Sequence, residues 1–325
     1  MARVLLAWEL GEGISYTRTL AKIAQALVAR GHQPIFAVKD LARANAVITG
    51  DFPILQAPFC HPRAWFADTP FVASTFADVL ALKGYASVET LLPLIEAWQG
   101  LLDLIQPQLL IVSYAPSLCL AAYRTLPVID VSSAWFNMPP LMGDKFPDLV
   151  AGRTPLVSQH DMLATVQEVQ QRRGRSFPAT LPGMLSVDHR FLMMLPDLDP
   201  YRRLREESHW DPLESLPTPQ PSMAGRSFFA YLNADYPRAE DVLQTVMAAG
   251  WPGAAYLGGS SAEQRFRLRQ HGVDILEKPA TEEQMLNYAV LLHHGGIGTS
   301  QVALAAGRPQ LRMARLSASC ISEAP

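Results

Sequence analysis

The sequence predicts an α/β protein made of two doubly wound, Rossmann-like domains. Short apolar runs alternate with helical patterns, the alternation restarts after a proline-rich segment, and 325 residues are enough for two domains. Apolar residues make up 49% of the chain and charged residues 18%, so each half can bury a core. We expect an amino-terminal domain over residues 1–210, a linker over 211–226 and a carboxy-terminal domain over 227–325.

The amino-terminal half alternates predicted strands and helices from its first residues. Apolar runs predict strands over 3–7, 34–38, 54–57, 109–112, 128–131 and 191–195, and helical periodicity predicts helices over 17–30, 76–82, 87–105, 118–124 and 162–172. This order favours a parallel sheet with helices on its faces and ligands beyond the carboxyl ends of its strands. The charged residues 202–207 are interpreted as a solvated face.

The second half follows a segment of linker composition. Four prolines, Pro212, Pro217, Pro219 and Pro221, fall between residues 211 and 224. Strands are then predicted over 228–232, 254–257, 274–276 and 288–292, with helices over 237–249, 281–286 and 301–306. After Leu311 the pattern stops, so we expect this second domain to be incomplete.

The most specific motif follows the strand predicted over 288–292 and reads His293-His294-Gly295-Gly296-Ile297-Gly298-Thr299. A strand, a Gly-rich turn and a helix can hold a phosphate, because glycine lets the backbone approach and the first helical N–H groups point at the anion. The Thr299 hydroxyl and the His294 ring can add donors to diphosphate oxygens. A tight turn that needs glycine only for its geometry is the alternative, and the residues alone leave both open.

This motif, with its continuation to Leu311, resembles the donor-binding signature of the UDP-glycosyltransferase superfamily, which has the GT-B fold and includes macrolide-type glycosyltransferases. Residues 196–201 and 229–232 also resemble segments that flank the family's linker. The resemblance implies transfer of a hexose, with inversion, from a UDP- or dTDP-sugar to a small, apolar acceptor. The donor-binding residues that it implies are His293, His294, Gly295, Gly296, Gly298, Thr299, Asn233, Gly258 and Gly259.

The catalytic pair that the resemblance implies is missing at its matching positions. In the family, a His in the turn after the first strand takes the acceptor proton, and an Asp after a later strand orients that His. Tyr16 and Ser113 occupy these positions here. Glu12, in the same turn as Tyr16, is a candidate base, with a solvated turn carboxylate as the alternative, and His61 is a further loop candidate.

Two other classes of function therefore stay open. Tyr16, Ser113 and the shortened end favour a non-catalytic relative that binds a nucleotide sugar or partners a glycosyltransferase. Val302 favours it too, because it stands where the family often has a ribose-binding Glu. A dinucleotide-dependent oxidoreductase would explain Gly11-Glu12-Gly13 after the first strand, but Tyr16 stands where that fingerprint needs a later glycine. Whether the chain is an enzyme is left open, although the family predicts a hexosyltransferase.

The loop over residues 132–140 offers candidate acceptor-pocket residues, Trp135, Phe136 and Met138, with packing of the loop on its own domain as the alternative. The partners expected are thus a small acceptor and a nucleotide sugar, with no cofactor and no metal ion. A net charge of −3 gives no footprint for nucleic acid or an anionic membrane. No apolar run of about 18 residues predicts a transmembrane helix, and the first apolar run is too short for a signal peptide, so we expect a cytoplasmic protein.

Overall fold

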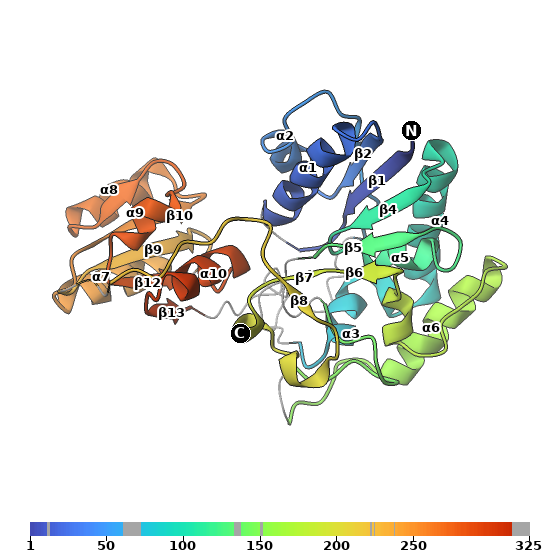
Figure 1. Cartoon of the computed structure of the whole chain (residues 1–325). Coiled ribbons are helices and arrows are strands. Elements are labelled where there is room, and N and C mark those ends of the chain that lie inside the picture. Colours follow the sequence, from blue (N-terminus) through green and yellow to red (C-terminus); the bar gives the residue numbers. More distant parts are fainter. Residues whose placement is uncertain are drawn as a thin grey trace. The chain divides into compact units, whose positions relative to one another are not determined.

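A computed structural model of the chain describes residues 1–11, 14–60, 73–132, 138–149, 152–221, 223, 225–236 and 238–313. The chain forms two compact units, whose main segments are Met1–Leu213 and Glu214–Leu316. Each unit has its own parallel sheet, and the units are described one at a time (Figure 1).

The first unit is built on a six-stranded parallel sheet in the order β3-β2-β1-β4-β5-β6. Its strands are β1 (Arg3–Trp8), β2 (Gln33–Val38), β3 (Ile54–Gln56), β4 (Leu109–Val112), β5 (Val128–Asp130) and β6 (His189–Arg190). Its helices are α1 (Ser15–Val28), α2 (Leu41–Asn45), α3 (Phe76–Leu80), α4 (Val88–Ile105), α5 (Pro116–Ala121) and α6 (Gln159–Arg172). Val4, Leu5 and Leu6 of the central β1 are at most 1% exposed, as expected for a strand covered on both faces.

The strand predicted over residues 191–195 is present but shorter, and it does not join the main sheet, because the chain leaves β5 at Phe191. The Phe191 N–H donates to the Asp130 carbonyl at 2.8 Å and ends the pairing of β6 with β5. The next two residues form β7 (Leu192–Met193), which pairs with β8 (His209–Trp210) in a separate two-stranded sheet. The pairing of β7 with β8 brings residues 207–210 close to the carboxyl end of β6, where Arg190 pairs with Glu207.

The helix predicted over 118–124 also differs from the structure, where α5 occupies Pro116–Ala121. It begins two residues earlier because Pro116 takes the first helical position, where a missing N–H costs nothing. It ends early because the chain turns after Ala122, and Arg124 has a positive φ of 57°. The helix predicted over 87–105 is confirmed as α4, which ends on Gln106 in the left-handed conformation.

The second unit is built on a five-stranded parallel sheet in the order β11-β10-β9-β12-β13. Its strands are β9 (Phe228–Asn233), β10 (Gly253–Gly258), β11 (Asp274–Leu276), β12 (Val290–His293) and β13 (Gln310–Arg312), and its helices are α7 (Ala239–Ala248), α8 (Ala262–Gln270), α9 (Glu282–Leu286) and α10 (Ile297–Ala305). Successive residues of β9 face opposite sides, so Phe228 packs in one buried cluster and Phe229 in another.

Two elements of this unit are absent from the sequence-based prediction. Helix α8 buries only Leu268, and its Ser261 capping box rather than an apolar stripe marks its start. Strand β13 is polar, but its residues continue the sheet, with Gln310 opposite Leu291 and Arg312 opposite His293. Chain beyond Leu311 therefore still contributes to the sheet.

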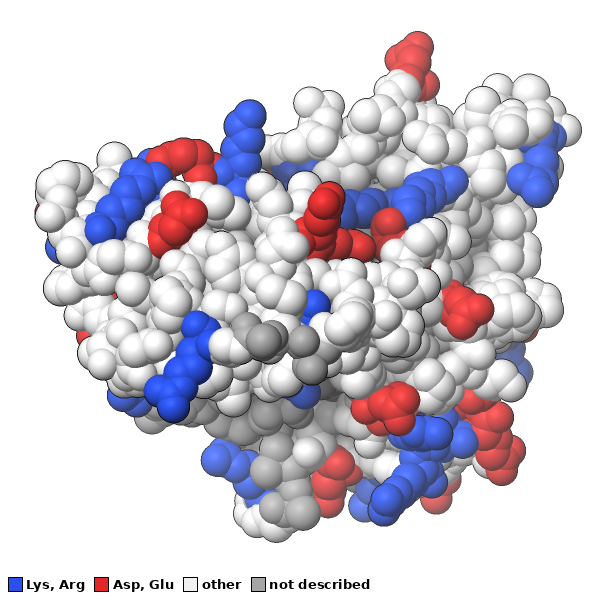
Figure 2. All heavy atoms as spheres, turned by 60° about the vertical axis from the view of Figure 1, so that its left-hand side comes forward, with Lys and Arg blue, Asp and Glu red and all other residues white. Residues whose placement is uncertain are grey.

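The surface carries charges of both signs. On the face drawn in Figure 2, Lys and Arg side chains are interspersed with Asp and Glu side chains on a mostly uncharged surface. Within the described residues, no helix is both long and apolar enough to span a membrane.

Candidate functional site

The Gly-rich turn of the second unit joins β12 to α10. Gly295 has a φ of +89°, a conformation that side chains other than glycine rarely adopt. Gly296 is the N-cap of α10, and a glycine has no side chain that could cap the first-turn amides. The first-turn amides of α10 have no intrahelical acceptor, so they are suited to bind an anion placed at the turn.

His294 links this turn to the end of the neighbouring strand β9. Its Nε2 accepts a hydrogen bond of 2.8 Å from the Asn233 backbone N–H, and its ring lies edge-on to Tyr236 at a centroid distance of 5.2 Å. An Nε2 atom that accepts leaves the ring proton of neutral His294 on Nδ1. The carboxyl ends of β9 and β12 are thus joined through one imidazole whose tautomer is set by the backbone.

His293 has a different environment from its neighbour. Its side chain is buried, its Nδ1 accepts from the Gly295 N–H at 3.0 Å, and its Nε2 lies 2.9 Å from Gln310 Oε1. Burial lowers the pKa of His293 to about 4, although the hydrogen bond with Gln310 acts in the opposite direction. Sequence reasoning grouped His293 with the donor-binding residues, whereas these contacts make its ring part of the structure of the turn.

Glycine residues also line the ends of the adjacent strands. Gly258 pairs with Asn233, and a side-chain carbon at Gly258 would lie 2.9 Å from the Asn233 Oδ1 atom. Gly259 follows with a φ of +73°. A side-chain carbon at Gly295 would lie 3.0 Å from Nε of Arg312, so this guanidinium lies beside the Gly-rich turn. Sequence reasoning missed Arg312, because it follows the last residue of the family resemblance.

Tyr16 and Ser113, in the first unit, occupy the positions where the family resemblance places the base and its partner. Tyr16 is 5% exposed, stacks on Trp8 with ring centroids 5.8 Å apart, and contacts the Tyr114 ring at 6.0 Å. Ser113 is fully buried, and its hydroxyl finds no hydrogen-bond partner among the described residues. A packed aromatic cluster thus stands at these positions.

Glu9 is a buried carboxylic acid directly after β1. It accepts hydrogen bonds from the backbone N–H of Ser117, at 2.9 Å, and from the Ser117 hydroxyl, which also lies 2.7 Å from the Tyr85 hydroxyl. Burial raises the pKa of Glu9 to about 7, although the bonds from Ser117 act in the opposite direction. Glu9 is not among the residues predicted from the sequence to act, and its place directly after an apolar strand was the signal available.

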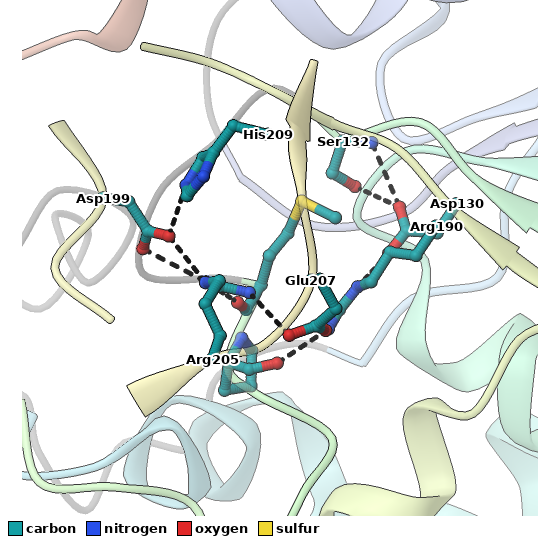
Figure 3. Close-up of polar contacts among 9 residues, drawn as sticks. Asp130, Ser132, Arg190, Asp199, Arg205, Glu207 and His209 are labelled. Carbon is teal, nitrogen blue, oxygen red and sulfur yellow. Dashed lines mark hydrogen bonds and ion pairs between the residues drawn. The ribbon is translucent and has the colours of Figure 1, made fainter. Parts of the chain in front are cut away.

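A network of ionised side chains lies at the carboxyl ends of β5 and β6 (Figure 3). Arg190 pairs with Asp130 at 3.3 Å and with Glu207 at 3.2 Å, and Arg205 pairs with Asp199 at 2.6 Å. The members drawn and labelled in Figure 3 are Asp130, Ser132, Arg190, Asp199, Arg205, Glu207 and His209. Residues 202–207 were predicted to be a solvated face. That prediction is wrong for Arg205, whose side chain is 1% exposed.

This network also holds the segment that precedes α6. Arg205 donates to the Met138 carbonyl at 2.6 Å, and Arg190 donates to the Pro139 carbonyl at 2.8 Å. Met138 itself is buried. Of the other residues predicted to act in the first unit, Glu12, His61, Trp135 and Phe136 lie outside the described residues. The described residues contain no group of three or more His, Cys, Asp or Glu side chains able to hold a metal ion.

The two parallel-sheet units define the class of fold as GT-B, the fold of many glycosyltransferases, and comparison with solved structures confirms it. No protein-family model matches the sequence, and no curated protein matches it significantly.

Among the solved structures, the calicheamicin glycosyltransferase CalG4 matches 99% of this chain over 82% of its own, with a TM-score of 0.66 and 14% identity. SnogD, a glycosyltransferase from Streptomyces nogalater, matches 97% of this chain over 82% of its own, with a TM-score of 0.57 and 19% identity. The match to the spinosyn rhamnosyltransferase SpnG in complex with thymidine diphosphate covers 97% of this chain and 81% of the SpnG chain, with a TM-score of 0.60 and 15% identity.

Proposed function

We propose that this chain is a glycosyltransferase that takes a hexose from a UDP- or dTDP-sugar and transfers it, with inversion, to a small, apolar acceptor. The observation that carries the proposal is the uncapped start of α10 behind a turn that requires glycine at 295. In this proposal the diphosphate binds the first-turn amides of α10, the Thr299 hydroxyl and the His294 ring. Asn233, Gly258 and Gly259 line the donor side.

Solved relatives by fold support the class of ligand. The structures of SpnG include one complex with thymidine diphosphate and another with spinosyn aglycone, so a protein of this fold binds both a nucleoside diphosphate and an aglycone. We propose the cytoplasm as the location of this chain, and the buried free thiol of Cys119 suits a reducing compartment.

Isothermal titration with UDP, dTDP and UMP tests the donor site. We expect both diphosphates to bind more tightly than UMP, and His294→Ala to weaken UDP binding about 10-fold to 100-fold, since a hydrogen bond to a charged group is worth about 1.5–3 kcal/mol. His271→Ala, which removes an exposed histidine of the same unit, is the matched control. A folded wild-type protein that gives no heat with either diphosphate would refute the proposal.

A non-catalytic nucleotide-sugar-binding relative is the second candidate. The buried aromatic cluster of Trp8, Tyr16 and Tyr114 favours it, because that cluster leaves no base at the position that the family resemblance implies. An assay for nucleotide diphosphate release separates the two candidates. Turnover supports the transferase, whereas diphosphate binding without turnover supports the non-catalytic relative.

A further inference from the structure

His209 and Asp199 form a histidine–carboxylate pair in the first unit. Nε2 of His209 lies 2.8 Å from Oδ2 of Asp199, whose carboxylate is fully buried, while 14% of the His209 side chain remains exposed. The pair of His160 with Asp161 is longer, at 3.3 Å, and both of its side chains are more than 80% exposed. The His209 pair therefore has the short distance and the shielded carboxylate that orient an imidazole.

The Asp199 carboxylate is fixed from three sides. In addition to its contact with His209, it accepts a hydrogen bond of 2.9 Å from the Tyr201 backbone N–H. It also forms an ion pair of 2.6 Å with Arg205. Figure 3 shows the carboxylate between the His209 ring and the Arg205 guanidinium. An ionised carboxylate held this way accepts the Nε2 proton of a neutral imidazole and leaves the lone pair on Nδ1.

The position of the network matches the place where this class of sheet binds ligands. Asp130 and Arg190 are the last residues of β5 and β6, and ligands of open parallel sheets bind beyond the carboxyl ends of the strands. The same two arginines hold the carbonyls of Met138 and Pro139, in the loop predicted to line the acceptor pocket. The dyad is thus anchored to the backbone of that loop.

We propose that His209, oriented by Asp199, is the general base that takes the proton of the acceptor hydroxyl. This inference rests on the proposed function and supplies the base that is missing at Tyr16 and Ser113. The acceptor O–H bond breaks and its proton passes to Nδ1 of His209. The acceptor oxygen bonds to the anomeric carbon, and the bond from that carbon to the diphosphate breaks with its electron pair on the diphosphate. The imidazolium then returns its proton to water.

The test compares two acceptors with one ring system, using UDP-glucose and dTDP-glucose as donors. At pH 8, 4-nitrophenol is already ionised and needs no base, whereas 4-nitrobenzyl alcohol must lose its proton during the reaction. We expect His209→Gln to lower turnover with the alcohol about 10²-fold to 10⁴-fold, and to change turnover with the phenol less than threefold. The Gln side chain can still donate to Asp199, so the network is retained, and a thermal unfolding curve checks this.

His160→Gln is the matched control, and Asp199→Asn should reproduce the selective loss with the alcohol. Equal losses with both acceptors, or no loss with the alcohol, would overturn the assignment of His209. If UDP and dTDP bind but the wild-type protein transfers sugar to neither acceptor, the assignment of His209 as general base is refuted. The proposed nucleotide-binding site is retained in that case. If neither diphosphate binds, the proposed function itself fails and the base fails with it.

Discussion

The buried carboxyl group of Glu9 makes the stability of the first unit depend on pH. Glu9 is 1% exposed, and its pKa is raised to about 7 in the folded state from an ordinary value of 4.5. Between these two pH values the folded chain binds a proton that the unfolded chain does not bind. The contribution of protonated Glu9 to the free energy of unfolding is therefore complete below pH 4.5 and is lost as the pH rises through 7.

The size of this effect follows from the shift in pKa. Each pKa unit corresponds to about 1.4 kcal/mol, so a shift from 4.5 to about 7 lowers the free energy of unfolding by about 3 kcal/mol between pH 4.5 and pH 8. Glu9→Gln removes the titration and keeps a neutral group that can accept the Ser117 N–H. We expect the variant to gain about 3 kcal/mol relative to wild type over the same interval.

Urea unfolding at pH 4.5, 6, 7 and 8, followed by tryptophan fluorescence, measures this difference, because Trp8 lies beside Glu9 in the chain. The quantity of interest is the variant minus the wild type at each pH, which cancels the contribution of every other titrating group. Glu206→Gln, at an exposed position of the same unit, is the control and should give a flat difference. A constant difference between wild type and Glu9→Gln across this range would refute the reasoning.

Two further predictions concern the Gly-rich turn. Gly295→Ala should destabilise the second unit by about 1–2 kcal/mol and weaken UDP binding, because its φ of +89° is unfavourable for alanine and the new carbon would lie 3.0 Å from Arg312 Nε; urea unfolding and titration measure both. The pKa of His293 is about 4 when folded and 6.5 when unfolded, so its contribution to stability is present above pH 6.5 and lost as the pH falls toward 4. His293→Gln should reduce this loss by about 3 kcal/mol, measured by unfolding at pH 7 and pH 4.

Each of these predictions has a matched comparison. Gly298 lies inside α10 with open space where a side-chain carbon would be, so Gly298→Ala should leave stability unchanged or raise it slightly. Equal effects of alanine at 295 and 298 would contradict the argument from φ. For His293, the exposed His271→Gln should leave the acid sensitivity unchanged, and an unchanged sensitivity in His293→Gln would contradict the argument from burial.

Most strands of both parallel sheets could be predicted from the sequence, because a buried parallel strand is a short apolar run that can be recognised without knowing which strand it pairs with. β1, β9 and β12 are of this kind. The elements that it missed lack such a pattern. Helix α8 is mostly charged, and β13 is a polar strand at the sheet edge whose pairing with β12 depends on a neighbour about twenty residues away.

The candidate site was predictable where it is local in sequence and not where it is assembled from distant segments. One motif contains both His294 and Gly295. The network of the first unit joins Asp130 to Arg190, sixty residues later, and Arg190 to Glu207. Nothing in the spacing of these residues marks them as partners. The pairing of β6 with β5 places Arg190 opposite Asp130, and the pairing of β8 with β7 brings the chain that carries Glu207 back to the same end of the sheet.

The stacked rings of Trp8, Tyr16 and Tyr114 limit how this protein could change. An imidazole in place of the Tyr16 phenol would leave a gap beside Trp8, and the Ser113 hydroxyl offers no negative charge to hold it. A histidine–carboxylate pair at these two positions would require at least two substitutions, and the first alone would lower stability without supplying the pair. Single substitutions would therefore leave the stacked rings in place, and acid–base chemistry in this unit would have to come from other residues.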